Sequence, residues 1–257
     1  MDLGLRDKRF VIGGASKGLG RAVAEALAAE GARVLLVSRD EAALNTVAAG
    51  LGDRAAGVVA ANVADPEAVE KISAAVDQTL GGLDGILINA GGPPGGDVLS
   101  LTDEQWLDSF HLLIGGPIRL LRVLVPKIEG EGAILFITST SVRQPIPNLD
   151  TSNVLRPGVA ALAKVLAREL GPKIRVNSLM PGRFNTDRIR WLDQDRAQAQ
   201  GITVEEQKAA ASQQIPLGRY GEPVEIGRVG AFLLSPAASY VSGVALQADG
   251  AMVTALP

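Results

Sequence analysis

The chain contains no cysteine, and it has one histidine and two tyrosines among its 257 residues. Without cysteine there is no disulfide framework, no thiolate metal site and no thiol nucleophile. The single histidine, His111, belongs to no cluster with nearby carboxylates, so we expect no metal site. We expect His111 either to face solvent or to be satisfied within the core, and not to donate a proton in catalysis.

A strong net charge and long apolar runs are also missing. The formal net charge is -3 with the basic residues dispersed, which argues against a nucleic-acid surface. No apolar run is long enough to cross a bilayer, and no apolar segment follows the first charged residues to mark export. We therefore expect a cytoplasmic protein with no nucleic-acid or membrane partner.

The residue patterns that are present predict an α/β fold. At 47% apolar content, 257 residues can bury one sizeable core, so residues 1–257 are expected to form a single domain. Short β-branched runs alternate with helical patterns, which indicates a doubly wound, Rossmann-like parallel sheet of seven strands. The strands are predicted at 10–13, 34–37, 57–60, 85–89, 133–138, 174–177 and 244–247. Helices are predicted at 22–30, 67–80, 104–125, 159–170 and 224–234, with an exposed polar helical insertion at about 187–214 that shapes the substrate pocket.

A glycine-rich loop follows the first predicted strand. Residues 13–20 read Gly-Gly-Ala-Ser-Lys-Gly-Leu-Gly and open a helix. Backbone N–H groups at such a helix start can bind a pyrophosphate, and glycine lets the phosphates approach closely. The alternative is a glycine-rich turn with a structural role only.

The spacing Gly-x-x-x-Gly-x-Gly of this loop resembles that of the short-chain dehydrogenase/reductase family. The resemblance continues along essentially the whole chain, through Asn89-Ala-Gly91, the strand end Thr138-Ser139, Pro181-Gly182 and Asp249-Gly250. It implies a nicotinamide-dependent oxidoreductase. The cofactor-binding residues that it implies are Gly14, Ser16, Lys17, Gly18, Leu19, Gly20, Ser38, Arg39, Asn62, Val63, Asn89, Gly91, Arg156, Pro181, Gly182 and Thr186.

The second strand indicates which nicotinamide cofactor is used. In the family an acidic residue that ends this strand binds the ribose of NAD, but here that position is Ser38, followed by Arg39. Lys17 of the glycine loop should lie beside the same ribose, so two cations favour the extra phosphate of NADP(H) over NAD(H). The alternative is a pair of solvated surface cations.

The catalytic positions depart from the family pattern. Where the family has Tyr-x-x-x-Lys, this chain has Ser152 and Arg156, and the position of the helix Asn is Leu113. Ser139 retains the catalytic Ser that the resemblance implies. Arginine keeps its proton at any working pH, so Arg156 can stabilise an oxyanion and bind a ribose but is a poor general acid.

The predicted function is hydride transfer to or from a small carbonyl, quinone or enone, with Ser139, Ser152 and Arg156 as catalytic residues. The alternative is a catalytically impaired dinucleotide-binding or regulatory protein.

Pro157 is unfavourable inside a helix, and a helix that restarts with Pro157 near its first turn would avoid the strain. Either arrangement would change the direction of Arg156.

Three arginines are candidates for a substrate site. By the family topology, the loops that carry Arg143, Arg156 and Arg183 face the nicotinamide pocket, which would suit an anionic substrate. The alternative is that one or two of them pair with Asp150 or Asp187 as structural struts. The resemblance also implies a homo-oligomer, a tetramer or dimer, associated through the helices 104–125 and 159–170.

Overall fold

The structure, a computed structural model, describes residues 1–255 and contains one seven-stranded sheet. All neighbouring strands are parallel, and their order is β3-β2-β1-β4-β5-β6-β7. The strands are β1 (Arg9–Gly13), β2 (Arg33–Ser38), β3 (Ala55–Ala60), β4 (Leu83–Ile88), β5 (Ile128–Ile137), β6 (Ile174–Pro181) and β7 (Ala245–Ala248). This arrangement confirms the predicted doubly wound, Rossmann-like fold with seven parallel strands.

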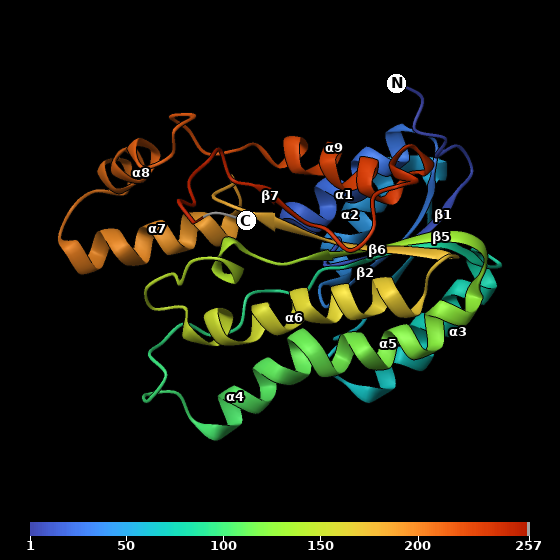
Figure 1. Cartoon of the computed structure of the whole chain (residues 1–257), viewed down its shortest axis with the longest axis horizontal. Helices are drawn as coiled ribbons and strands as arrows, with labels where there is room; N and C mark the ends of the chain where they lie inside the picture. The colour runs from blue at the N-terminus through green and yellow to red at the C-terminus, as the bar shows by residue number, and fades with distance from the viewer. Residues whose placement is uncertain (256–257) are drawn as a thin grey trace.

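Helices cover both faces of the sheet (Figure 1). One face carries α1 (Gly18–Ala29), α2 (Glu41–Leu51) and α9 (Pro223–Leu234), and the other carries α3 (Pro66–Thr79), α5 (Gly116–Leu124) and α6 (Asp150–Glu169). Each face has its own apolar cluster, and the strands contribute side chains to both. This burial on both sides explains why the strands are continuous apolar runs rather than alternating ones.

The helix predicted at 104–125 is interrupted. It consists of α4 (Asp103–Phe110), a π-helical turn over His111–Gly115, and α5. Pro117 has no N–H to donate to the carbonyl four residues earlier, which accounts for the wider turn just before it.

The stretch Asp103–Lys127 passes a test of length and hydropathy for a membrane-spanning helix, contrary to the expectation from the sequence. A single such helix is weak support for a membrane span, because the core helix of a soluble protein passes the same test. Leu120, Leu121 and Leu124 are buried in the cluster beneath the sheet, as expected for a core helix.

Helix α6 starts earlier than predicted. It runs from Asp150 without a break, so of the two arrangements considered for Pro157 the structure has the one with this residue inside the helix. The first turn is held by tertiary hydrogen bonds: Thr151 Oγ1 donates to the Pro94 carbonyl at 2.8 Å, and the Asn153 side chain bonds both the N–H and the carbonyl of Ile146 at 2.9 Å. These bonds offset the missing donor of Pro157, and they fix the direction of the residues on this turn.

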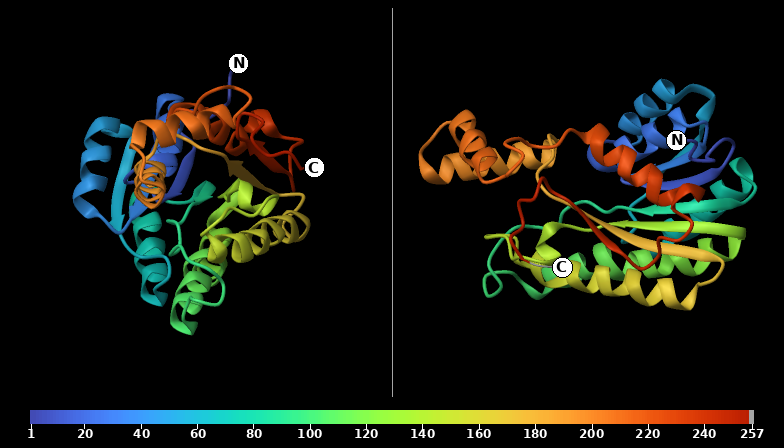
Figure 2. Two further views of the ribbon diagram at one scale, coloured as in Figure 1. Left: turned by 90° about the vertical axis from the view of Figure 1, so that its left-hand side faces the viewer. Right: turned by 45° about the horizontal axis from the view of Figure 1, so that its top comes forward.

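The polar segment predicted at 187–214 folds as two helices, α7 (Asp187–Gln200) and α8 (Val204–Gln213). Figure 2 shows that the pair projects beyond one end of the sheet, away from the other helices.

Helix α2 was not predicted, and only Leu44 and Val47 of its residues are buried. So short a buried stripe gives a weak helical signal in the sequence.

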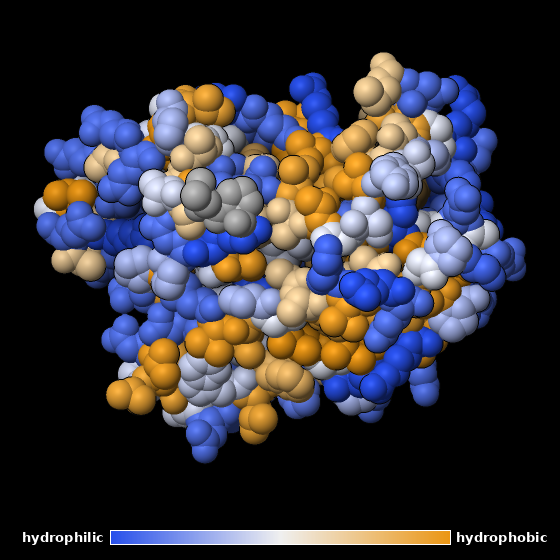
Figure 3. Space-filling model, viewed as in Figure 1, coloured by the Kyte–Doolittle hydropathy of each residue, from blue (hydrophilic) through white to orange (hydrophobic). Residues whose placement is uncertain are grey.

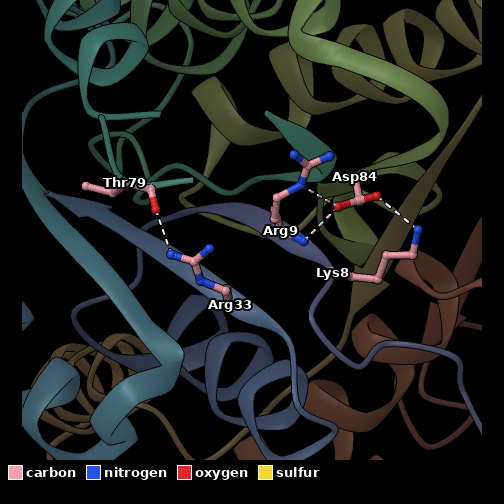
Figure 4. Close-up of polar contacts among 5 residues, drawn as sticks. All are labelled: Lys8, Arg9, Arg33, Thr79 and Asp84. Carbon is pink, nitrogen blue, oxygen red and sulfur yellow. Dashed lines mark hydrogen bonds and ion pairs between the residues drawn. The ribbon is translucent and has the colours of Figure 1, made fainter. Parts of the chain in front are cut away.

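An ionic cluster lies at the amino edge of the sheet, where strands β1 and β4 begin (Figure 4). The Asp84 carboxylate accepts hydrogen bonds from the N–H and Nε of Arg9 at 2.9 and 3.0 Å and from Lys8 Nζ at 3.0 Å. Burial alone would raise the pKa of Asp84, but the hydrogen bonds from Arg9 and Lys8 outweigh it and lower that pKa. The carboxylate therefore joins β4 to β1 in its charged form.

Asp84→Asn is expected to lower the free energy of unfolding at neutral pH by about 1–3 kcal/mol, since it leaves two part-buried cations without their partner. The native pKa is depressed, so this stabilisation is present above the unfolded-state value of 3.8 and is lost as the pH falls through the native value. Urea unfolding of both proteins at pH ~7 and pH ~3 should therefore show a difference that shrinks in acid. Asp77→Asn, which breaks an exposed pair with Lys127, is the control and should cost less than about 1 kcal/mol. A gap between wild type and Asp84→Asn that is equally large in acid would contradict this explanation.

Candidate active site

A cavity of about 1150 Å³ opens at the carboxyl edge of the strands, between the sheet and helix α7. It is lined by most of the residues predicted from the sequence, namely Gly14, Ser16, Lys17, Gly18, Leu19, Ser38, Arg39, Asn62, Val63, Asn89, Gly91, Ser139, Ser152, Arg156, Pro181, Gly182, Arg183 and Thr186. Two predicted residues, Gly20 and Arg143, do not line it. The structure thus brings residues from distant parts of the chain to one place.

The glycine loop between β1 and α1 forms one end of the cavity. Gly14 and Gly18 have φ of 62° and 58°, the left-handed region that favours glycine. A Cβ on Gly20 would lie 2.3 Å from the Gly14 carbonyl oxygen and 2.7 Å from Asn89 Nδ2, so packing requires a glycine at this position. Lys17 caps α1 without a side-chain hydrogen bond, which leaves the first N–H groups of the helix available to an anion.

Two exposed cations line the cavity near the end of β2. Lys17 and Arg39 form no ion pair within residues 1–255, and Arg39 Nη2 lies 4.0 Å from the Cβ position of Gly91. The adjacent carboxylate of Asp40 accepts a hydrogen bond from the N–H of Ala43 at 3.0 Å and so caps α2. Lys17 and Arg39 are therefore two cations that could bind an anion at this end of the cavity.

Arg156 lies in the wall of the cavity and is 8% exposed. Its Nε donates to Ser152 Oγ at 3.0 Å, and its Nη1 donates to the carbonyls of Ile137 and Thr138 at 3.2 and 3.0 Å. Those carbonyls directly precede Ser139, whose Oγ accepts a bond from the N–H of Ser141 at 3.1 Å. Arg156 thus ties α6 to the strand end that carries Ser139.

Burial, and secondly the positive charge of Arg188, lower the pKa of Arg156 to about 10. The group therefore remains a cation at neutral pH. Its charge lies next to the hydroxyl oxygen of Ser152, where it would favour negative charge on a bound oxygen.

Arg183 is engaged in a buried network. It forms an ion pair with Asp193 of α7 and lies over the ring of Tyr220, with Cζ 4.9 Å from the ring centroid. Tyr220 Oη donates to the same carboxylate at 3.0 Å, and Asp193 is 2% exposed. Arg183 is therefore neutralised as a strut, although its partner is neither of the aspartates predicted.

The predicted convergence of three arginines is not observed, since Arg143 is exposed and does not line the cavity. The aspartates expected as struts are bonded elsewhere: Asp150 accepts from the N–H of Val98, and Asp187 pairs with Arg190.

Arg188 and Leu112 are among the cavity residues that were not predicted from the sequence. Arg188 of α7 lines the cavity and donates to the Pro93 carbonyl at 3.3 Å, and Leu112 lines it in place of Leu113. Leu113 is buried in the core instead, because the π-helical turn changes the register of the helix after α4. The spacing of Arg188, Leu192 and Arg196 along one face of α7 was the available signal.

Known proteins resemble the chain over its whole length. The family profile described as enoyl-(acyl carrier protein) reductase matches residues 14–252. The 3-oxoacyl-(acyl-carrier-protein) reductase FabG of Vibrio cholerae is 32% identical, and the alignment covers 97% of this chain and 99% of that protein. The chain belongs to the short-chain dehydrogenase/reductase family.

Solved structures of the family agree with this assignment. The L-sorbose reductase of Gluconobacter frateurii, complexed with NADPH and L-sorbose, has a TM-score of 0.94 and 32% identity, with 100% of both chains covered. An NADPH-bound short-chain oxidoreductase of Pseudomonas aeruginosa PAO1, described as containing an atypical catalytic center, has a TM-score of 0.87 and 28% identity. That alignment covers 97% of this chain and 98% of the other.

The cavity of this short-chain dehydrogenase/reductase has no tyrosine or histidine among the described residues that line it. The hydroxyl of Tyr220 is bound to Asp193, Tyr240 is fully exposed, and His111 is exposed on the π-helical turn. Hydroxyl groups and arginines, including Ser139, Ser152, Arg156 and Arg188, are among the side chains that line the cavity.

Gly20→Ala is expected to destabilise the glycine loop, because its Cβ would meet the Gly14 carbonyl oxygen at 2.3 Å. Overpacking of this kind costs about 1–3 kcal/mol, and the melting temperature should fall accordingly. Gly50→Ala is the matched control: its Cβ would have no neighbour within 4 Å, and alanine should stabilise α2 by about 0.5–1 kcal/mol. Thermal unfolding of the two variants tests the difference in sign. Equal melting temperatures for the two variants would show that the loop relaxes around the added methyl group.

Proposed function

We propose that this protein is an NADP(H)-dependent oxidoreductase that transfers a hydride to or from a small carbonyl, quinone or enone. The observation that carries the proposal is the hydrogen bond of 3.0 Å from Arg156 Nε to Ser152 Oγ in the cavity wall. It gives the site a fixed positive charge beside a hydroxyl group. The glycine loop also lines this cavity, which supports a bound nucleotide close to this charge.

Cofactor binding would use three groups of residues. Lys17 and Arg39 would bind the 2'-phosphate, and the free N–H groups at the start of α1 would bind the diphosphate. Thr186, the N-cap of α7, would contact the nicotinamide end. Bound NADPH would supply the hydride. The NADPH complexes among the relatives, including the L-sorbose reductase, support this choice of cofactor.

Catalysis would rest on charge stabilisation. Ser152 Oγ accepts a hydrogen bond from Arg156, so its O–H group is free to donate a hydrogen bond to the oxygen of a substrate. Ser139 would donate a second hydrogen bond to that oxygen, and the charge of Arg156 would stabilise it as it becomes negative. Because Arg156 stays protonated, the proton that neutralises the product would come from solvent. Acceptors whose reduced form is a stabilised anion, such as quinones and activated enones, suit this site best.

A second candidate function is nucleotide binding without turnover, in a regulatory protein. The observation that favours it is the absence of a tyrosine or histidine among the described cavity residues. NADPH oxidation with quinones, activated enones and unactivated ketones distinguishes the two, since only the first function consumes NADPH.

We also propose that the protein is cytoplasmic and forms a homo-oligomer through α4, α5 and α6. Exposed apolar side chains gather there, including Leu107 (59% exposed), Phe110 (42%), Val154 (55%) and Val165 (49%). Figure 3 shows apolar residues over α6 and the neighbouring part of α4 on the face that it presents. Burial of such a patch against a second copy removes apolar surface from water.

For the cofactor, NADPH is expected to bind more tightly than NADH, and Arg39→Asp should erase or reverse the preference. A carboxylate at this position would repel the 2'-phosphate, and the lost charge-assisted bonds correspond to about a tenfold or larger change in affinity. Fluorescence titration of both nucleotides measures it, with Arg122→Asp on the exposed surface of α5 as a matched control. Stronger binding of NADH by the wild-type protein would refute the assignment.

For the chemistry, Arg156→Ala is expected to lower kcat/KM for a quinone. The lost transition-state stabilisation should be about 2–4 kcal/mol. Ser152→Ala should also reduce it, and unactivated ketones should be poor substrates of the wild type. Arg168→Ala, on the last turn of the same helix, is the control, and melting temperatures are followed in parallel. If Arg156→Ala lowers only the melting temperature, with turnover and NADPH affinity unchanged, Arg156 serves architecture alone.

A further inference from the structure

Two arginines of the cavity have no carboxylate partner. Arg188 donates to the Pro93 carbonyl and lies over the Trp191 ring, with Cζ 4.9 Å from its centroid. Arg156 donates only to the Ser152 hydroxyl and to backbone carbonyls. Within residues 1–255 neither forms an ion pair. Their charges are therefore uncompensated by the described part of the chain.

Two of the carboxylates that line the same cavity are engaged close to their own positions in the sequence. Asp40 caps α2, and Asp187 pairs with Arg190. Burial, and secondly the charge of Arg183, lower the pKa of Arg196, whereas the charges of Asp193 and Asp195 oppose this shift and so partly compensate Arg196. Burial also lowers the pKa of Arg188, and no carboxylate opposes it. Two like charges in a partly desolvated cavity repel each other, and an anion between them would relieve the repulsion.

Both guanidinium groups retain capacity to bind a ligand. Arg156 uses Nε and Nη1 in its hydrogen bonds, and Nη2 forms none with the described residues. Arg188 lies against Gly92, where a Cβ would be 3.0 Å from its Nε, so the bare glycine lets the guanidinium lie on the loop that borders the cavity. The two groups come from different helices, α6 and α7, and line one cavity.

We propose that the substrate of this cavity carries a carboxylate, bound by Arg188 and by the free Nη2 of Arg156. A guanidinium fork matches the two oxygens of a carboxylate, and the bonds are charge-assisted. Arg183 takes no part, since Asp193 already neutralises it. This inference rests on the proposed oxidoreductase function and specifies the class of its substrate.

The test compares two ligands that differ in charge. The enone 3-benzoylacrylate and its methyl ester share one skeleton, and calorimetry measures their binding to the full-length protein, alone and saturated with NADP⁺. The acid is expected to bind about tenfold or more tightly than the ester, as charge-assisted bonds require. Its affinity should fall with rising ionic strength, whereas that of the ester should not.

Variants of α7 assign the preference to Arg188. Arg188→Gln should reduce the preference for the acid to less than about threefold, and Arg188→Lys should keep part of it, since lysine retains charge without the fork. Arg168→Gln is the control, because Arg168 is exposed on α6, does not line the cavity and forms no ion pair within residues 1–255. The affinity for NADPH should change less than about twofold in all three variants, since the proposed phosphate contacts are made elsewhere.

Three outcomes would overturn the proposal. These are equal affinity for acid and ester, no saturable binding of the acid, and a loss of NADPH affinity in Arg188→Gln that would assign this residue to the cofactor. The first two are measured on the wild type and do not depend on the folding of a variant. Normal NADPH binding and turnover without a preference for the acid would reject the carboxylate site alone, whereas absence of NADPH binding would reject the proposed function.

Discussion

The reversal of strand order between β1 and β4 is the constraint on which the site depends. From β1 the chain builds outward to β2 and β3, and it then returns to place β4 on the other side of β1. Helices α1 and α3 consequently cover opposite faces of the sheet (Figure 1). The cavity lies at the carboxyl ends of the strands, where this change of direction leaves a crevice. Asn89 Nδ2 donates to the Gly13 carbonyl at 3.3 Å and so joins the ends of β4 and β1 beside this crevice. Its side chain occupies the space that a Cβ on Gly14 or Gly20 would need.

The arginines that line the cavity have different roles: Arg183 is a structural residue, whereas Arg156 and Arg188 are proposed to bind a ligand. Asp193 is nearly inaccessible, so its charge must be satisfied internally, and it receives both the ion pair from Arg183 and the hydroxyl of Tyr220. These three residues hold α7 to the segments that follow β6 and precede α9, which positions Arg188 at the cavity. The ion pair of Arg183 with Asp193 therefore helps to hold Arg188, which has no carboxylate partner, at the cavity.

Arg156 is more than a charge equivalent to the family's lysine. A lysine ammonium is a point charge, whereas the planar guanidinium donates in three directions from fixed positions. Here one edge bonds Ser152, four residues earlier on the same helix, and another bonds the carbonyls of Ile137 and Thr138. The side chain therefore anchors α6 to β5 and still presents one nitrogen without a hydrogen bond to the described residues. Its burial favours a well-defined orientation. Burial also lowers the pKa of Arg156, but only to about 10, so the group is still cationic at neutral pH.

The sequence by itself determined the sheet, the glycine loop and most residues around the cavity. Buried parallel strands need continuous β-branched runs, and a loop that approaches phosphates needs glycine, so both leave a local signal. The start of α6, the partner of Arg183 and the exchange of Leu112 for Leu113 were decided only by the tertiary structure. Each depends on contacts distant in sequence or on helix register: Thr151 with Pro94, Asp193 with Tyr220, and the π-helical turn before Pro117. Arg188 likewise reaches the cavity only because α7 is docked by that buried carboxylate, and local patterns carry no information about which distant side chain neutralises a buried charge.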